Sequence, residues 1–354
     1  RSVVGSRIEI HNRITSLPRG IYLAKDAAAT SCKMFTILRN LGVPILAWDE
    51  EAIIYYDVGQ FLRKRVCDCT IKRTERYLTW GEEQRQELAA TPLFADVPLE
   101  PTGNPRIDML RPELRAFFDD EVAELRRRFG RFVLINTNFG RLNHFLAEKK
   151  LTPSAPGEEA RRNLAPNDIA LEIWRFRDEI FRAFQEMLPA QARALPDIAV
   201  VLRPHPAEQP AFWAGLAQGL PNVHVLHEGS VIPWLLAAEV TIHNGCTTGL
   251  EAYLLDRPVI AYRPVQDPAR ELMLPNDLSR SVASIDELVA AVREVLEGRH
   301  NFAPTPATLA ALKARLAGLE GPLVGERVLD VVDRMVAAGG DKACASLPQR
   351  LEGW

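Results

Sequence analysis

The segment that decides the fold is VTIHNGCTTGLEAYLLDRPVIAY, at residues 240–262. Its pattern predicts a short buried strand at residues 240–242, a helix that ends near residue 255 and a second strand at residues 258–262. A strand, a helix and another strand in this order form two parallel strands joined by a helical crossover. The segment therefore indicates a parallel α/β sheet.

The same alternation extends to both sides of this segment. Further strands are predicted at residues 2–5, 20–23, 43–48, 132–135, 198–202 and 223–226. Helices are predicted at residues 27–41, 114–129, 169–188, 208–218 and 305–338, and Ser284-Ile285-Asp286-Glu287 is a capping-box sequence that opens one more. Residues 141–168 are polar and contain prolines, which is typical of an insertion or mobile loop.

The chain of 354 residues is long enough for two domains, each with its own core. The turn cluster Thr102-Gly103-Asn104-Pro105-Arg106 is the best boundary between them. We expect a Rossmann-like N-terminal domain over residues 1–104, a Rossmann-like C-terminal domain over residues 105–300, and helices and a tail over residues 301–354. The first sheet starts in the middle of the pattern, as if a strand and a helix preceded Arg1.

Composition excludes several classes of protein. A net charge of −3 gives no overall attraction to nucleic acid, and no apolar stretch is long enough to span a bilayer. No signal peptide is recognisable, and the five scattered cysteines suggest reduced thiols in a cytoplasmic protein. The spacing at Cys67-Asp68-Cys69 does not suit a metal site, and the sequence has no nucleotide-cofactor or Walker motif. We therefore expect neither a metal nor a cofactor.

Ligands of open α/β sheets bind beyond the carboxyl ends of the strands. One polar cluster at such an end is the turn at residues 243–248, where Asn244, Thr247 and Thr248 lie at the start of a helix. Backbone N–H groups and the helix dipole favour a phosphate there, and Glu251, one turn later, could accept bonds from a ribose. The alternative is that a threonine merely caps the helix.

A second cluster is Arg203-Pro204-His205-Pro206, which follows the strand at residues 198–202. The prolines stiffen the turn and leave the side chains of Arg203 and His205 as its donors. These side chains suit a phosphate through charge-assisted hydrogen bonds. The alternative is a structural histidine bonded to a nearby carbonyl.

Two more clusters follow strands nearer the N-terminus. Asp49, Glu50 and Glu51 include a candidate base for an acceptor hydroxyl, although a run of charges is usually solvated surface. Asn136 and Asn138 could bind sugar hydroxyls or phosphate oxygens, but asparagine is equally common in turns.

Together these residues resemble a known family. The resemblance rests on residues 20–26, 48–52, 103–108, 135–139, 203–206 and 243–248, and it extends from near Arg1 to about residue 300. The sequence is similar to the surface carbohydrate biosynthesis protein family, taken to be of GT-B type. More distantly, it is similar to bacterial GT-B sialyltransferases and Kdo transferases, which use CMP-activated acidic sugars. This resemblance implies an α/β fold of two doubly wound domains that face a central cleft.

The resemblance also assigns roles to residues of this chain. Asp49, Glu50 and Glu51 match an acidic motif in which one carboxylate acts as acid or base, and Ala52 stands where those families have glycine, so the catalytic carboxylate stays open. His205 matches the histidine of an HP motif that contacts the donor phosphate. Thr247 and Thr248 match a hydroxyl pair that binds the same phosphate.

The predicted function is transfer of a sugar, Kdo or another acidic sugar, from CMP to a glycan or glycolipid acceptor in bacterial surface polysaccharide biosynthesis. The predicted location is the cytoplasm, with peripheral association at the inner membrane or with an assembly complex left open. Two different functions also stay open. One is that of an enzyme of the same fold that uses a UDP-sugar, including a nucleotide-sugar epimerase. The other is that of a non-catalytic protein that binds a glycan or nucleotide.

Overall fold

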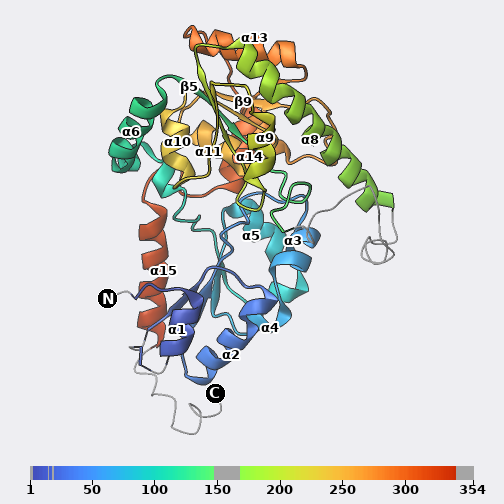
Figure 1. The fold of residues 1–354 in the computed structure, drawn as a ribbon. Helices are drawn as coiled ribbons and strands as arrows, with labels where there is room; N and C mark the ends of the chain where they lie inside the picture. The colour runs from blue at the N-terminus through green and yellow to red at the C-terminus, as the bar shows by residue number, and fades with distance from the viewer. Residues whose placement is uncertain (1–2, 15, 18–19, 147–167, 340–354) are drawn as a thin grey trace. The chain divides into compact units, whose positions relative to one another are not determined.

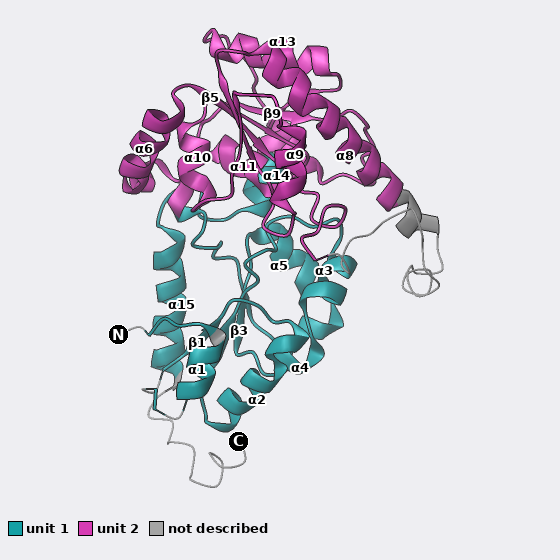
Figure 2. Ribbon diagram, in the orientation of Figure 1, with its two compact units in different colours: residues 1–108, 310–354 teal, residues 109–309 magenta. Residues whose placement is uncertain are grey.

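The structure is a computed structural model that describes residues 3–14, 16–17, 20–146 and 168–339 (Figure 1). The chain divides into two compact units, shown in teal and magenta in Figure 2. Unit 1 contains residues 1–108 and 310–354, and unit 2 contains residues 109–309. The C-terminal segment from residue 310 thus belongs to the same unit as the N-terminal hundred residues.

Unit 1 is built on a small parallel sheet. Its strands are β1 (Tyr22–Ala24), β2 (Ile45–Ala47), β3 (Arg76–Leu78) and β4 (Leu99–Glu100), in this order across the sheet. Its helices are α1 (Arg7–Arg13), η1 (Ala29–Ser31), α2 (Cys32–Asn40), α3 (Val58–Arg65), α4 (Asp68–Ile71), α5 (Glu82–Ala89), η2 (Pro92–Phe94) and α15 (Val324–Gly339). Two further helices, η3 (Asp108–Leu110) and α14 (Pro306–Arg315), cross the boundaries between the units.

The helix α15 completes the core of unit 1. Its apolar side chains Val324, Val328 and Val331 are buried against Leu46 of β2 and Leu78 of β3. A sheet that is buried by helices has continuous apolar strands, as the fully buried run in β2 shows. Residues near the C-terminus are therefore part of the N-terminal unit's core.

The turn cluster at residues 102–106 has a structural role in this packing. A Cβ atom on Gly103, whose φ is +91°, would lie 2.5 Å from the carbonyl oxygen of Ala317. The carboxylate of Asp108 accepts hydrogen bonds from the backbone N–H groups of Val324 and Gly325, at 2.7 and 2.8 Å. Asp108 therefore satisfies the first donors of α15, as a capping carboxylate does.

Unit 2 is built on a larger parallel sheet. Its strands are β5 (Phe132–Asn136), β6 (Ala199–Arg203), β7 (Val223–Val225), β8 (Val240–His243), β9 (Val259–Tyr262) and β10 (Arg280–Val282). Their order across the sheet is β10-β9-β8-β5-β6-β7. The helices of this unit are η4 (Pro112–Phe118), α6 (Asp119–Phe129), α8 (Asp168–Ala194), α9 (Pro210–Leu216), α10 (Val231–Ala237), α11 (Thr247–Leu254), α12 (Met273–Asp277) and α13 (Ile285–Leu296).

Helices cover both faces of this sheet. On one face, alternate strand residues such as Val133 and Ile242 form a single apolar cluster with Phe184 of α8 and Trp213 of α9. On the other face, Trp234 of α10 packs edge-to-face on Phe132 of β5, with ring centroids 6.2 Å apart. Because successive side chains of a strand point to opposite faces, each strand contributes to both layers. The predicted parallel, doubly wound α/β architecture is confirmed.

Several local predictions are also confirmed. The capping box at Ser284 is present, since Ser284 Oγ accepts from the N–H of Glu287 at 3.2 Å and Glu287 Oε2 accepts from the N–H of Ser284 at 3.3 Å. The predicted apolar face of this helix, which includes Leu288 and Val292, is buried. Gly42 ends α2 with a φ of +73°.

The predicted strand at residues 2–5 is wrong. Residues 3–5 form no secondary structure, and Val3 and Val4 are 57% and 95% exposed. Four residues with two valines resemble a buried strand, but here no neighbouring strand pairs with them, and Ser6 caps α1 directly afterwards. The predicted insertion or loop at residues 141–168 falls largely on residues 147–167, outside the described part of the chain.

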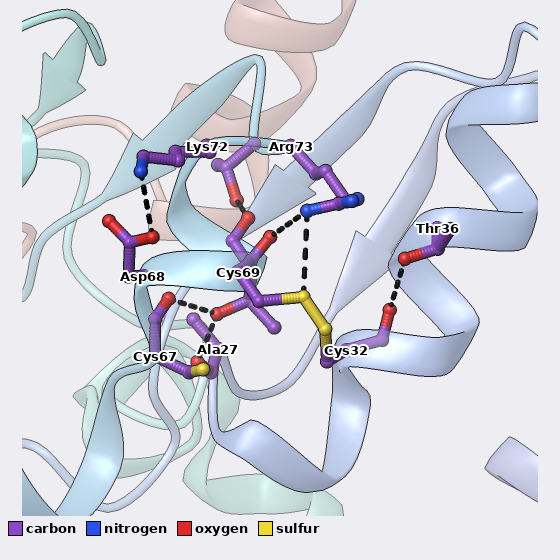
Figure 3. The surroundings of a disulfide bond; sticks show 10 residues. Ala27, Cys32, Thr36, Cys67, Asp68, Cys69, Lys72 and Arg73 are labelled. Atoms are coloured by element: carbon purple, nitrogen blue, oxygen red, sulfur yellow. Dashed lines mark hydrogen bonds and ion pairs between the residues drawn. A yellow bond between two sulfur atoms is a disulfide. The ribbon is translucent and has the colours of Figure 1, made fainter.

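The expectation of reduced thiols is wrong for two cysteines. Cys32 and Cys69 form a disulfide, with their Cα atoms 5.8 Å apart (Figure 3). The bond joins the first residue of α2 to α4, which lie together through tertiary packing and not through sequence proximity. Arg73 Nη1 donates to the carbonyl of Cys69 at 2.8 Å, while Cys67 stays a free thiol.

Within the described residues, no helix is both long enough and apolar enough to pass through a lipid bilayer.

We predict that the disulfide stabilises unit 1 measurably. Closing a loop of 37 residues reduces the entropy of the unfolded chain, which corresponds to about 4 kcal/mol. Under oxidising conditions, C32S and C69S should each lower the free energy of unfolding in urea by roughly that amount. The matched control is C67S, which removes a neighbouring free thiol. Equal unfolding midpoints for all four proteins would show that the bond contributes nothing.

Candidate functional site

The strand order of unit 2 creates a switch point between β5 and β8. The chain builds β5, β6 and β7 outward in one direction, then returns and places β8, β9 and β10 on the other side of β5. The connections after β5 and β8 leave in opposite directions, which makes the carboxyl ends of these strands a topological switch point. Open α/β sheets bind their ligands there. The described strands of unit 1 follow one another across the sheet in sequence order, so their order does not reverse and they form no switch point.

The turn between β8 and α11 lies at this switch point. Gly245 has a φ of +77°, a conformation that glycine adopts without strain. Cys246 is the N-cap residue of α11, and its thiol, a weak hydrogen-bonding group, contacts Thr248 Oγ1 at 2.7 Å in place of a capping oxygen. Thr247 and Thr248 are thus the first residues of the helix and not its caps. The first turn of α11 combines backbone N–H groups, two hydroxyls and the positive end of the helix dipole.

A buried histidine shapes this turn. His243 is fully buried, and its Nδ1 accepts a hydrogen bond from the N–H of Gly245 at 3.0 Å. The proton is therefore on Nε2, which donates to Ser279 Oγ at 2.8 Å. Burial lowers the pKa of His243 to about 3, so the imidazole is neutral. A Cβ on Gly249 would lie 2.4 Å from His243 Nε2, and only glycine fits against this ring.

The second predicted cluster follows β6, the neighbour of β5. The guanidinium of Arg203 is buried, and it donates to the carbonyls of Glu228 at 2.6 Å and Gly229 at 3.2 Å. It also stacks on Trp234 at 4.7 Å, and burial lowers its pKa to about 10. Arg203 therefore anchors the loop before α10. His205 is exposed, and its Nδ1 accepts from the N–H of Ala207 at 3.1 Å, so a neutral ring carries its proton on Nε2.

A buried carboxylate joins the ends of β5 and β6. Glu208 is 2% exposed, and its Oε1 accepts from Thr137 Oγ1 at 2.7 Å, from the N–H of Phe139 at 2.9 Å and from the N–H of His205 at 3.1 Å. Its Oε2 accepts from Trp213 Nε1 at 2.8 Å. Because one carboxylate satisfies donors on both segments, it holds the loop after β5 beside the loop that carries His205.

The two predicted asparagines after β5 differ in environment. Asn136 is 5% exposed, and its Nδ2 has no hydrogen-bond partner among the described residues. It is the last residue of β5 and pairs in register with Arg203, so it lies at the switch point. Asn138 is exposed two residues later. Of the two, Asn136 is the buried donor that a ligand at this edge would satisfy.

The remaining predicted residues of unit 2 lie on β8–α11. Asn244 directly follows β8, and its buried Oδ1 has no hydrogen-bond partner in the described part of the chain. Glu251 is 1% exposed in the middle of α11. The structure therefore brings Asn244, Thr247 and Thr248 together in one turn, with Asn136 at the end of the adjacent strand.

The predicted acidic cluster belongs to unit 1 and follows β2. The side chain of Asp49 is fully buried, and Arg65 binds both its oxygens, with Nε–Oδ2 and Nη2–Oδ1 distances of 2.8 and 3.0 Å. The side chain of Glu51 is 74% exposed and contacts Arg65 Nη1 at 3.0 Å. Glu50 is half exposed, 3.7 Å from Lys25 Nζ. The three consecutive carboxylates thus have different accessibilities, and only Glu50 and Glu51 are open to a substrate.

Asp49 acts as an internal anchor of this segment. Burial raises the pKa of its carboxyl above the usual value, and the contact with Arg65 offsets part of that rise. Its Oδ1 also accepts from the N–H of Glu51 at 2.9 Å, and its carbonyl accepts from Trp80 Nε1 at 2.7 Å. Its hydrogen bonds are therefore committed to holding Glu51 and the loop in place.

Within the described residues, no three histidine, cysteine, aspartate or glutamate side chains are arranged to hold a metal ion. Sequence reasoning did not identify Glu208 and Ser279, and it included His243 in the turn without assigning a role to it. The signal for His243 was its position at the end of a strand that was predicted to be buried, and all four residues of β8 are buried. Glu208 had no such signal.

Comparisons with known proteins identify the fold. No protein-family model matches the sequence, and no curated protein matches it. Among solved structures, the chain is similar to a putative UDP-N-acetylglucosamine 2-epimerase from Listeria monocytogenes, with a TM-score of 0.51 and 12% identity over 95% of this chain and 78% of that one. The UDP-GlcNAc 2-epimerase from Neisseria meningitidis bound to UDP-GlcNAc has a TM-score of 0.49 and 12% identity. The match covers 92% of this chain and 79% of that one. The wall teichoic acid polymerase TagF has a TM-score of 0.49 and 10% identity. The match covers 82% of this chain and 67% of that one.

The chain therefore has a GT-B-like α/β fold with two parallel sheets, and this expectation is confirmed. At 12% identity the similarity concerns the fold. Membership of the surface carbohydrate biosynthesis family stays a prediction.

We predict that Glu208 is essential to the packing between the β5 and β6 ends. E208Q places an amide N–H₂ where donors now converge, so at least one buried donor loses its acceptor, which costs about 1–3 kcal/mol. Urea unfolding should show a lower midpoint with an unchanged slope. The control is E239Q, which removes a carboxylate that contacts Arg131 at the surface and should change stability by less than about 0.5 kcal/mol. Equal losses in both variants would contradict this role.

We also predict a pH dependence of stability that comes from His243. Its folded pKa of about 3 lies below the ordinary value of 6.5, so the unfolded chain binds the proton more readily. The stabilisation is complete above pH 6.5 and decreases as the pH falls from 6.5 towards 3, by about 1.4 kcal/mol per pH unit. The variant H243N keeps an acceptor for Gly245 and does not titrate. Between pH 7.5 and 5 its free energy of unfolding should therefore fall less than that of the wild type, and parallel profiles would refute the assignment.

Proposed function

We propose that this chain is a glycosyltransferase of bacterial surface polysaccharide biosynthesis. It would transfer an acidic sugar such as Kdo from a CMP-activated donor to a glycan or glycolipid acceptor, at the inner face of the cytoplasmic membrane. The observation that carries the proposal is the first turn of α11, which begins with a cysteine in place of a capping oxygen at the β5–β8 switch point. Such a turn suits the phosphate of a nucleotide.

Side chains around this turn support a phosphate ligand. Thr247 and Thr248 contribute hydroxyls from the first turn, and Asn136 contributes a buried N–H group that has no partner among the described residues. We assign the Nε2–H of His205 as a further donor. When the sugar leaves, negative charge develops on the nucleotide phosphate, and donors that are already oriented stabilise it without a metal ion.

The acceptor hydroxyl requires a base, and we assign this role to Glu50 or Glu51. Both carboxylates are accessible, whereas that of Asp49 is buried and bound by Arg65. Arg65 also contacts Glu51 and orients it. A positioned carboxylate typically contributes a rate factor of roughly 10²–10⁴.

The second candidate function is that of an enzyme that uses a UDP-sugar, including a nucleotide-sugar epimerase. The observation that favours this candidate is the fold shared with a putative UDP-N-acetylglucosamine 2-epimerase. The third candidate is a protein that binds a nucleotide or glycan without turnover, in which the carboxylates of residues 49–51 do no chemistry.

Calorimetric binding of CMP and UDP tests the nucleotide site. We expect CMP to bind more tightly than UDP to the wild type. T247A and T248A should each weaken CMP binding by roughly tenfold or more, the loss expected for a hydrogen bond to a charged group. The control is T308A, in α14, whose hydroxyl contacts Thr305. Preference for UDP would favour the second candidate, and no binding of either nucleotide would refute a nucleotide site.

Turnover of CMP-sugars tests the catalytic part of the same proposal. E50Q or E51Q should lose activity by roughly 10²–10⁴-fold while it keeps CMP affinity and thermal stability. The control is E124Q, in α6, which forms an ion pair with its helical neighbour Arg127 at the surface. If the wild type binds CMP but turns over no CMP-sugar offered, the third candidate, a binding protein, is supported instead.

A further inference from the structure

A buried polar chain lies behind the β8–α11 turn. The guanidinium of Arg263, which follows β9, binds both oxygens of Glu271, with Nε–Oε2 and Nη2–Oε1 distances of 2.6 and 2.8 Å. Both side chains are almost buried, at 12% and 7% exposure. Glu271 Oε1 also accepts from the N–H of Asp267 at 2.7 Å, and Oε2 accepts from Asn276 Nδ2 at 2.8 Å.

These contacts fix the orientation of the Asn276 amide. A carboxylate that is paired with arginine only accepts hydrogen bonds, so the NH₂ group of Asn276 must be the one directed at Glu271. The amide oxygen Oδ1 is therefore directed away from it. This side chain is 2% exposed, and Oδ1 has no hydrogen-bond partner among the described residues.

The amide group of Asn276 lies against the turn that begins the α11 site. Its Oδ1 and Nδ2 lie 3.5 and 3.7 Å from the point where a Cβ on Gly245 would stand. The backbone of Asn276 is fixed to the same turn, because its carbonyl accepts from the N–H of Ser279 at 3.0 Å and Ser279 Oγ bonds with His243. His243 in turn accepts from the N–H of Gly245. Oδ1 is therefore a rigidly held acceptor beside a residue without a side chain.

The residue before Gly245 in the turn carries a second acceptor that is unpartnered within the described residues. Asn244, immediately before Gly245, also has a buried Oδ1 without a partner among the described residues. Buried acceptors of this kind are uncommon, because each one loses its hydrogen bond to water. Neutral amide oxygens do not attract phosphate, but they match O–H donors. The turn therefore offers donors for an anion and, beside them, two acceptors for hydroxyl groups.

We propose that Asn276, with Asn244, binds the ribose diol of the nucleotide whose phosphate binds at the start of α11. The diol supplies two adjacent O–H donors, which match the two amide oxygens, and a nucleoside monophosphate carries both the diol and the phosphate. Arg263 and Glu271 act as positioning residues, since they hold the amide in the orientation that presents its oxygen. This inference rests on the proposed nucleotide site and extends it to sugar recognition.

The test varies the ligand and the protein together. Calorimetry should show that the wild type binds CMP about tenfold more tightly than 2′-deoxy-CMP or 3′-deoxy-CMP. N276A should bind CMP about tenfold more weakly and should no longer distinguish CMP from the deoxy analogue that the wild type rejects. The control is N301A, an exposed asparagine outside the site, which should behave as the wild type does. If the wild type selects UDP, the same design uses UDP and its deoxy analogues.

The outcomes separate the two proposals. Equal binding of CMP and both deoxy analogues by the wild type overturns the diol assignment and leaves the phosphate site intact, and this comparison needs no variant that might misfold. If N276A still prefers CMP to the deoxy analogues as strongly as the wild type does, the diol assignment is also overturned. If the wild type binds neither nucleotide, the proposed function fails, and this inference fails with it.

Discussion

The buried carboxylate of Glu208 is the interaction on which the candidate site depends. Four donors converge on its two oxygens, and they come from the loop after β5, the loop after β6 and α9. A charge that is buried this deeply is tolerated only when hydrogen bonds replace its hydration, so the loops must stay close to it. The position of His205 beside the end of β5 follows from this requirement. Strand order creates the switch point, and Glu208 fixes the loops after β5 and β6 beside each other.

Much of the architecture could be predicted from the sequence because it follows from local patterns. Apolar runs that alternate with helical periods predict parallel strands, and residues after those runs must lie at one edge of a sheet. This reasoning identified Asn136, His205 and Thr247 as residues at strand ends, where the structure places them. It failed at residues 2–5, because an apolar run becomes a strand only when a neighbouring strand pairs with it.

Interactions between distant segments could not be predicted in the same way. In the sequence Asp49, Glu50 and Glu51 are equivalent, and only the approach of Arg65 makes the first a buried anchor and leaves the others accessible. Cys32 and Cys69 become partners because two helices pack together. Glu208 has the appearance of a surface residue at a helix start, and its burial depends on donors from residues 137 and 139, which lie 71 and 69 positions away in the sequence.

The contribution of α15 to the core of unit 1 has a consequence for biosynthesis. Unit 2 is a continuous stretch of chain, whereas the core of unit 1 needs Val324, Val328 and Val331 to cover Leu46 and Leu78. Since domains fold as they leave the ribosome, the second unit in sequence can finish first, while the N-terminal sheet lacks the cover of α15 until that helix has left the ribosome. During that interval the nascent chain exposes the apolar side chains of Leu46 and Leu78 that α15 later buries.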